Sequence, residues 1–449
     1  MTALYTLCAA SFMGPFMGSA FNLALPRIAE AFSFKAVGLT WFPMAFMLST
    51  AVCQVPFARL GDMFGRKRVF LIGLLGMSLT IMVCPLAPSS RVLIILRFLS
   101  GVFSAMMFSG SVAMVVSVVT PEMRAKALAL NTASVYSALA LGPALGGFLI
   151  QYWGWESIFY LAAALTALIF ILSLLCIKGE WTEARGARFD YLGSLIFAAA
   201  LLGIIYGFTN LPRIHGLFSI AGGGAALVLF VVFEKKSASP LLDMSLFFSN
   251  RTFSLACLAA LINYAASASV AFIMSLYLQY VKGFSAGAAG MLLIIQALLQ
   301  VLAALSAGRL SARVPPARLA AAGMSLCALG LLGLCRIGPD APLGWLLFCL
   351  AALGCGFGLF SSPNTNVIMS SVEKRHYGQA SATTGTVRLT GQAVSMGLAA
   401  MCIALFAGDR EIRPEIYPDL LAGFRLTFII FTGLCLAGVY ASRAGRTAR

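Results

Sequence analysis

Long apolar runs constrain the fold of this chain more than any other feature. Fourteen stretches of about 20 mostly apolar residues follow one another along the 449 residues, and one such stretch is enough for a helix to cross a bilayer. The composition agrees, because 60% of the residues are apolar and 10% are charged, against about 45–50% and about 25% in soluble domains. A soluble enzyme, a disordered protein and a collagen-like fibre are excluded, and the sequence predicts an all-α polytopic membrane protein. The predicted spans are 4–26, 38–60, 68–88, 91–119, 126–150, 155–178, 190–211, 216–234, 252–279, 285–308, 318–336, 342–370, 378–407 and 420–441.

The excess of basic residues predicts the orientation of the chain. A formal net charge of +16 would suggest a nucleic-acid partner in a soluble protein. In a membrane protein the same excess arises because cytoplasmic loops collect Lys and Arg. With a cytoplasmic N-terminus, about two thirds of the 31 Lys and Arg residues fall in cytoplasmic loops or in the C-terminal tail. The sequence therefore predicts a multi-pass protein of the cell membrane, with both termini cytoplasmic, contacts to the lipid bilayer and no nucleic-acid partner.

An internal repeat predicts two related halves. The run Ala58–Arg68 after the second span and the run Gly308–Arg318 after the tenth share an Arg-Leu pair and a final Arg at matching positions. Two six-span halves separated by two extra spans give this spacing. The predicted domains are an N-terminal six-helix bundle over 1–178, two linker helices over 179–251 and a C-terminal six-helix bundle over 252–449. Repeated halves that rock about a central site are typical of transporters.

A short charged turn connects the second and third spans. Its residues are Gly61, Asp62, Gly65, Arg66, Lys67 and Arg68. Gly65 permits backbone angles that a β-carbon would penalise, and Asp62 can pair with a neighbouring Arg or cap a helix. The turn resembles the signature loop of the major facilitator superfamily and departs from it at Ala58, where the family has glycine. The resemblance implies the major facilitator fold, with two extra central spans, and a loop that latches the halves in the outward-facing state. It places Asp62 against the start of the thirteenth span.

Two further motifs narrow the resemblance. The fifth span contains Gly142, Pro143, Gly146 and Gly147, similar to the G-P-x-x-G-G motif of antiporters in this superfamily, where proline kinks the helix and glycines admit a neighbour. The first span ends in a run, 22–26, that resembles the fourteen-span drug:proton antiporters. This resemblance implies a monomeric secondary active transporter that exports small amphipathic molecules by alternating access, coupled to protons. The identity of the substrate does not follow from it.

The acidic residues argue against part of that expectation. None of the 15 Asp and Glu residues lies in the middle of a predicted span, and alignment on Pro26 puts Met17 where the family carries an Asp. A proton carrier usually needs a titratable group near the substrate route. Two cations, Arg97 and Arg388, lie inside predicted spans instead, and arginine does not release its proton readily. An exporter or uniporter of an anionic or neutral metabolite, using both arginines, therefore remains an alternative.

Other polar residues lie at plausible cavity depth, and each is as easily a contact between helices as a ligand contact. These residues are Asn22, Gln54, Asn131, Tyr136, Asn263, Tyr264, Gln296, Gln300, Asn364, Asn366 and Gln392. Ser361, Ser362 and Pro363 come just before the last asparagines of the twelfth span, and they predict a break in that helix.

Other functional classes have little support in the sequence. The 11 cysteines form no C-x-x-C pair and the two histidines are far apart, so we expect neither a metal site nor another cofactor. A membrane-embedded enzyme would need clustered acids, histidines or a nucleophile beside a base, and none of these patterns is present. A non-transporting membrane sensor is a less favoured alternative, because it would need a sizeable soluble module and no stretch between the spans is long enough.

Overall fold

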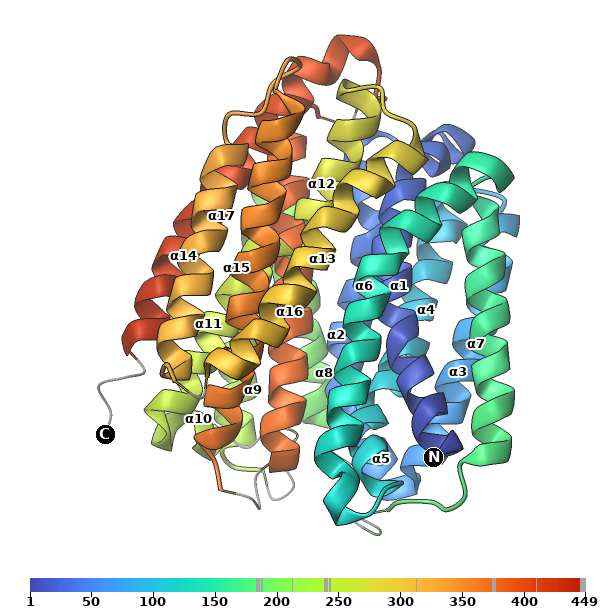
Figure 1. The fold of residues 1–449 in the computed structure, drawn as a ribbon, viewed down its shortest axis with the longest axis vertical. Helices are drawn as coiled ribbons and strands as arrows, with labels where there is room; N and C mark the ends of the chain where they lie inside the picture. Colours follow the sequence, from blue (N-terminus) through green and yellow to red (C-terminus); the bar gives the residue numbers. More distant parts are fainter. Residues whose placement is uncertain are drawn as a thin grey trace.

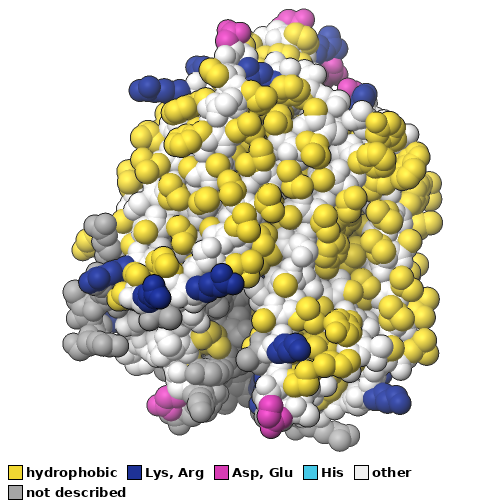
Figure 2. All heavy atoms as spheres, viewed as in Figure 1, with side chains coloured by type: hydrophobic (Ala, Val, Ile, Leu, Met, Phe, Trp, Pro, Cys, Tyr) yellow, Lys and Arg dark blue, Asp and Glu magenta, His cyan; other side chains and the backbone are white. Residues whose placement is uncertain are grey.

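The computed structural model describes residues 1–182, 186, 189–211, 213–237, 241, 244–311, 313–373, 377–408 and 410–444. In this part of the chain the secondary structure is helical, and strand pairing is confined to an isolated bridge between Lys35 and Glu411. Fourteen helices there are long and apolar enough to cross a membrane, which confirms the predicted all-α, fourteen-span architecture. Figure 2 shows hydrophobic side chains covering the middle of one face, with most charged side chains toward its two ends.

The first half of the chain forms one group of helices (Figure 1). Within it α1 packs against α6 and α7, and α4 packs against α2 and α3. Since a helix with an apolar surface all round must be buried or face lipid, these contacts bury the inner faces and leave the outer ones for the bilayer. The helices are α1 (Thr2–Phe32), α2 (Ala36–Phe64), α3 (Arg66–Val83), α4 (Ser90–Ser109), α5 (Ser111–Ser117), α6 (Arg124–Trp153) and α7 (Glu156–Cys176).

The last part of the chain forms the second group. Here α15 packs against α13 and α14, and α11 packs against α16 and α17. The helices are α11 (Arg251–Ser267), α12 (Val270–Leu276), a π-helical turn (Tyr277–Val281), α13 (Ala286–Leu310), α14 (Pro316–Leu334), α15 (Leu343–Ser370), α16 (Tyr377–Phe406) and α17 (Tyr417–Ala444).

The two extra spans form a helical hairpin between these groups. They are α8 (Tyr191–Thr209) and α9 (Ile214–Glu234), followed by the short α10 (Met244–Ser249). Of the two spans, α8 contacts both α2 of the first half and α16 of the second. The hairpin is therefore fixed to both halves along one side of the molecule.

Three spans differ in detail from the sequence-based expectation. The fourth divides into α4 and α5 at Gly110, and the ninth divides into α11, α12 and the π-helical turn. The predicted break in the twelfth span is wrong, because α15 continues through Pro363 as one helix. Proline can remain inside a membrane helix where neighbouring helices satisfy the freed backbone groups, and α15 is packed between α13, α14 and α11.

The two halves meet at the end that carries the α1–α2 connection, which we call the α1–α2 end. There the Ser275 hydroxyl donates to the Asn22 carbonyl oxygen at 2.7 Å, and the Ala36 amide donates to the Arg410 carbonyl oxygen at 2.9 Å. The opposite end carries the α2–α3 connection, and we call it the α2–α3 end. Figure 1 shows the ribbons of the halves drawn together at the first end and spread apart toward the second.

Candidate functional site

The stretch of α16 around Arg388 faces the boundary between the halves. A β-carbon added at Gly385 would lie 2.8 Å from Nε2 of Gln54 on α2, and one added at Gly391 would lie 2.8 Å from Cβ of Tyr264 on α11. At about 100° per residue, Arg388 projects about 60° away from each of these two glycines. Its side chain therefore points between a helix of the first half and a helix of the second, and it is exposed.

Side chains from four other helices lie near the stretch of α16 that carries Arg388. The Tyr136 hydroxyl on α6 lies near the Ser361 side chain on α15, and it interacts electrostatically with Tyr264 and Arg388. One turn before Ser361, Phe357 meets Tyr264 edge to face with ring centroids 5.4 Å apart. The structure thus brings together a guanidinium, two phenols and a hydroxyl from both halves. We call the set of Gln54, Tyr136, Tyr264, Ser361 and Arg388 the Arg388 group.

All members of the Arg388 group lie at a similar depth. Counting 1.5 Å per residue, each is about 14–20 Å from the end of its own helix on the α2–α3 side. The hydrogen-bonded contacts of the α1–α2 end lie beyond them. The group therefore lies between those contacts and the α2–α3 end, at a depth where α2 of the first half still approaches α16 of the second.

Arg97 lies apart from this group, inside the first half. Only 3% of the residue is exposed, and its guanidinium carbon is 4.8, 4.6 and 4.8 Å from the ring centroids of Phe21, Phe42 and Phe46. Its Nε and one terminal nitrogen have no hydrogen-bond partner. Three aromatic faces thus surround this buried cation. Such contacts contribute about 0.5–2 kcal/mol each, the most when they are desolvated.

The other polar residues predicted to lie at cavity depth differ in how deeply they are buried. Asn263 is fully buried and donates to the Met324 sulfur at 3.2 Å, while Asn364 donates to the Ala256 carbonyl oxygen at 3.0 Å. Both bonds join helices within the second half, so these two side chains act there as contacts between helices. Asn22, Asn131 and Gln300 are also buried, Gln296 and Gln392 are half-buried, and Asn366 is exposed.

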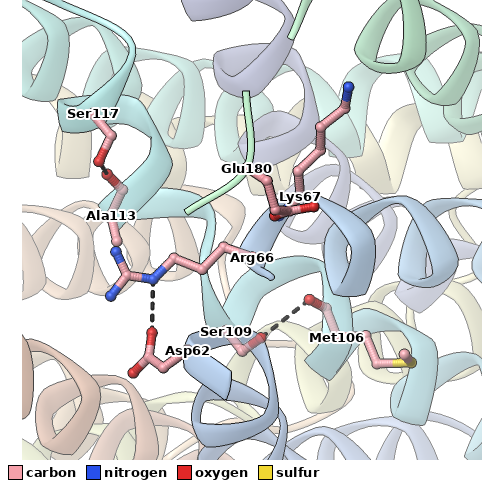
Figure 3. Close-up of polar contacts among 8 residues, drawn as sticks. All are labelled: Asp62, Arg66, Lys67, Met106, Ser109, Ala113, Ser117 and Glu180. Atoms are coloured by element: carbon pink, nitrogen blue, oxygen red, sulfur yellow. Dashed lines mark hydrogen bonds and ion pairs between the residues drawn. The ribbon is translucent and has the colours of Figure 1, made fainter. Parts of the chain in front are cut away.

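The charged turn between α2 and α3 is held by an ion pair and a tight backbone bend. The Arg66 guanidinium donates from Nε to the Asp62 carboxylate at 2.7 Å, as Figure 3 shows. Gly65 has a φ of 117°, a conformation that residues with a side chain rarely adopt. Gly61 and Gly65 bracket the end of α2, where the Gly65 amide donates to the Gly61 carbonyl oxygen at 2.9 Å. The expected contact of Asp62 at the start of the thirteenth span concerns side chains outside the described residues.

Glu180, which was not among the candidates predicted from the sequence, makes a second set of contacts at this turn. Its carboxylate accepts from the Lys67 amide at 2.8 Å, and Figure 3 shows Glu180 next to Lys67. The same carboxylate lies 3.7 Å from Nε of Arg68. The neighbouring Trp181 carbonyl oxygen accepts from the Arg66 amide at 3.1 Å. The linker between the first half and the α8–α9 hairpin therefore caps the start of α3. The sequence signal that could have identified these contacts is the acid and the Trp that directly follow the sixth predicted span.

The glycine motif of α6 packs on two sides at once. A β-carbon at Gly146 would lie 2.8 Å from Cβ of Ala20 on α1, and Gly142 faces Ser19 of the same helix. A β-carbon at Gly147 would lie 2.6 Å from the Ala286 carbonyl oxygen on α13, across the boundary between the halves. Pro143 lies on this second side, where its carbonyl oxygen approaches Gly290, and α6 continues through it as one helix.

The side chains gathered at the site can bind a ligand through hydrogen bonds, charge and aromatic contacts. Within the described residues no three His, Cys, Asp or Glu side chains gather in a way that could hold a metal ion. The cysteines are free thiols. What the boundary between the halves offers is a set of hydrogen-bond donors, one guanidinium and aromatic faces.

Comparison with known proteins places the chain in a family. The family model described as Major Facilitator Superfamily matches residues 7–396 and 256–444. The chain belongs to the major facilitator superfamily. It is 32% identical over 397 residues to the multidrug resistance protein Stp of Mycobacterium tuberculosis, covering 85% of this chain and 72% of that protein. It is 26% identical to the riboflavin transporter RibZ of Clostridioides difficile, covering 86% of this chain and 84% of that protein.

Solved structures of the superfamily share the fold. A bacterial homologue of the lysosomal transporter Spinster superposes with a TM-score of 0.70 at 14% identity, covering 99% of this chain and 96% of that chain. The peptide transporter POT gives a TM-score of 0.71 at 14% identity, covering 99% and 95%. The chain is thus a membrane transporter of this superfamily and not an enzyme.

Proposed function

We propose that this chain is a secondary active exporter of small amphipathic molecules, driven by protons and working by alternating access as a monomer. The observation that carries the proposal is the Arg388 group, which takes side chains from both halves and lies beside a closed α1–α2 end. Both sides of the site belong to one chain, so one chain is enough to form it. Resemblance to a multidrug resistance protein supports the direction of transport and the substrate class.

The basic loops support a cytoplasmic N-terminus for this proposal. With that orientation the closed α1–α2 end faces outward, and the spread α2–α3 end faces the cytoplasm. A substrate would then enter from the cytoplasm, bind between the halves and leave once the α1–α2 contacts open. Alternating access of this kind moves one half against the other around a fixed site.

Proton coupling needs a titratable group, and two acids are the first candidates. Glu30 near the end of α1 pairs with Arg27 at 3.1 Å, beside the contacts of the α1–α2 end. Glu156 begins α7 at the same end. A proton bound at either position would change the charge next to the closure. Glu415, an exposed acid before α17, is the matched control.

The test is dye export from bacterial cells that lack their own efflux pumps and express this chain. We expect lower accumulation of amphipathic dyes, reversed by a protonophore, with Glu30→Gln or Glu156→Gln losing the effect and Glu415→Gln keeping it. Equal accumulation with and without the expressed chain would contradict export. Export that survives the protonophore and both substitutions would contradict proton coupling.

A second candidate is a uniporter of an anionic or neutral metabolite. The exposed Arg388 between the halves favours it, because a fixed guanidinium can hold a carboxylate or a carbonyl group. The same cells discriminate the two functions, since a uniporter equilibrates its substrate without responding to the proton gradient.

A further inference from the structure

The Arg388 group contains several hydrogen-bond donors and a guanidinium but no carboxylate. Its members are a guanidinium, two phenols, a hydroxyl and an amide. In the described part of the chain, no ion pair is formed by Arg388, and its exposed side chain lies between helices of opposite halves. Carboxylates in the described chain lie toward helix ends or in connections, far from this depth. The local charge is therefore positive, and an anion would be the complementary ligand.

The amide of Gln54 adds a second observation. Its Oε1 is buried without a hydrogen-bond partner, while its Nε2 faces Gly385, one turn from Arg388 on the same side of α16. A buried amide with an unpaired oxygen has lost a hydrogen bond. Gln54 therefore adds an unsatisfied hydrogen-bond acceptor to the group.

Aromatic side chains beside Arg388 form a surface that the apolar part of a ligand can contact. Phe357 and Ser361 are four residues apart on α15 and so share one face of the helix. Phe357 is in edge-to-face contact with Tyr264, and Tyr136 approaches from the opposite half. Aromatic rings pack well against such faces. The polar and aromatic sides of the group are adjacent, as an amphipathic ligand requires.

We propose that the Arg388 group binds amphipathic organic anions, with the anionic group on Arg388 and Tyr136 and an aromatic body against Tyr264 and Phe357. The proposal rests on the proposed export function only for the claim that the bound anion is then transported. It distinguishes this chain from an exporter of lipophilic cations, because Arg388 repels a cation at the same place. Arg97 has no part in it, since the phenylalanine rings bury that side chain.

The test compares two dyes with the same xanthene core, the anion fluorescein and the cation rhodamine 123. Binding to the purified full chain is measured by fluorescence anisotropy. We expect fluorescein to bind about 10- to 100-fold more weakly to Arg388→Gln, the range for losing a charge-assisted hydrogen-bonded contact. Arg388→Lys should recover part of the affinity. Arg313→Gln removes the same charge from an exposed connection and should bind like the unmodified chain.

Two results separate this inference from the proposed function. Equal fluorescein affinity in the unmodified chain and in Arg388→Gln would overturn the anion site, even if the chain exports rhodamine 123. Binding of fluorescein that depends on Arg388, in a chain that moves neither dye across a membrane, would uphold the anion site and overturn export. A melting temperature of Arg388→Gln equal to that of Arg313→Gln shows that any loss of binding is not a loss of folding.

Discussion

Replacing Gly147 by alanine tests how the two halves are joined at the α1–α2 end. The added β-carbon would lie 2.6 Å from the Ala286 carbonyl oxygen and 3.1 Å from the Gly287 Cα. Both are backbone atoms of α13 and cannot rotate away, so α6 and α13 must move apart. Overpacking of this kind costs about 1–3 kcal/mol. The cost applies only to the conformation in which α6 and α13 touch, so the equilibrium shifts by about 5- to 150-fold toward opening of this end.

Hydrogen–deuterium exchange of the Ala36 amide measures that opening. This amide donates across the boundary to the Arg410 carbonyl oxygen at 2.9 Å, so separating the halves exposes it. We expect its exchange in Gly147→Ala to rise by about the same 5- to 150-fold, since exchange follows the free energy of local opening.

Two control variants separate opening from general destabilisation. Gly146→Ala adds a β-carbon 2.8 Å from Ala20 within the first half, so it should lower the melting temperature without selectively exposing Ala36. Gly222→Ala adds one into open space on α9 and should change neither. Unchanged exchange at Ala36 in Gly147→Ala, or an equal rise in Gly146→Ala, would show that contact between α6 and α13 does not hold this end closed.

Four further substitutions, of which Gly61→Ala is a control, have distinct expected outcomes. Asp62→Asn removes the charge that pairs with the neighbouring guanidinium, so flux should fall while the melting temperature shows a folded protein; unimpaired flux would contradict the latch. Gly65→Ala places a β-carbon at a φ of 117° and in overlap with the Glu180 side chain, so it should destabilise the folded protein by about 1–3 kcal/mol. Gly61→Ala adds a β-carbon that makes only ordinary contacts, so its melting temperature should be close to that of the unmodified chain. Arg97→Met replaces a buried cation, two of whose nitrogens lack hydrogen-bond partners, with an apolar side chain. The melting temperature should therefore rise. A lower melting temperature would show that the contacts of Arg97 with the aromatic rings outweigh the cost of burying its charge.

The spans were predictable because the bilayer leaves few alternatives. Backbone groups in lipid must be hydrogen-bonded within the segment, so an apolar run of sufficient length becomes a helix. The prediction at Pro363 failed because local rules treat proline as a helix breaker, whereas the packing of α15 among its neighbours keeps that helix continuous. Hydropathy carries no information about such packing.

The composition of the site was only partly predictable. Arg97 and Arg388 look alike in sequence, as cations within apolar runs, but one is enclosed by three rings and the other is exposed between the halves. The difference depends on how each helix is rotated in its bundle. Asn263 shows the same limit, because its buried contact with Met324 depends on a residue about sixty positions away that no spacing rule connects to it. Glu180 reaches the charged turn through a linker whose path the sequence does not specify.

Flux through the purified chain in proteoliposomes shows directly whether the chain itself moves dyes in response to a proton gradient. A pH gradient is imposed across vesicles that contain no other protein, and the movement of fluorescein and rhodamine 123 is followed against empty vesicles. We predict dye movement that requires both the chain and the gradient, with fluorescein moving faster than rhodamine 123 in the unmodified chain but not in Arg388→Gln. Dye movement equal to that of empty vesicles, with or without the gradient, would contradict it.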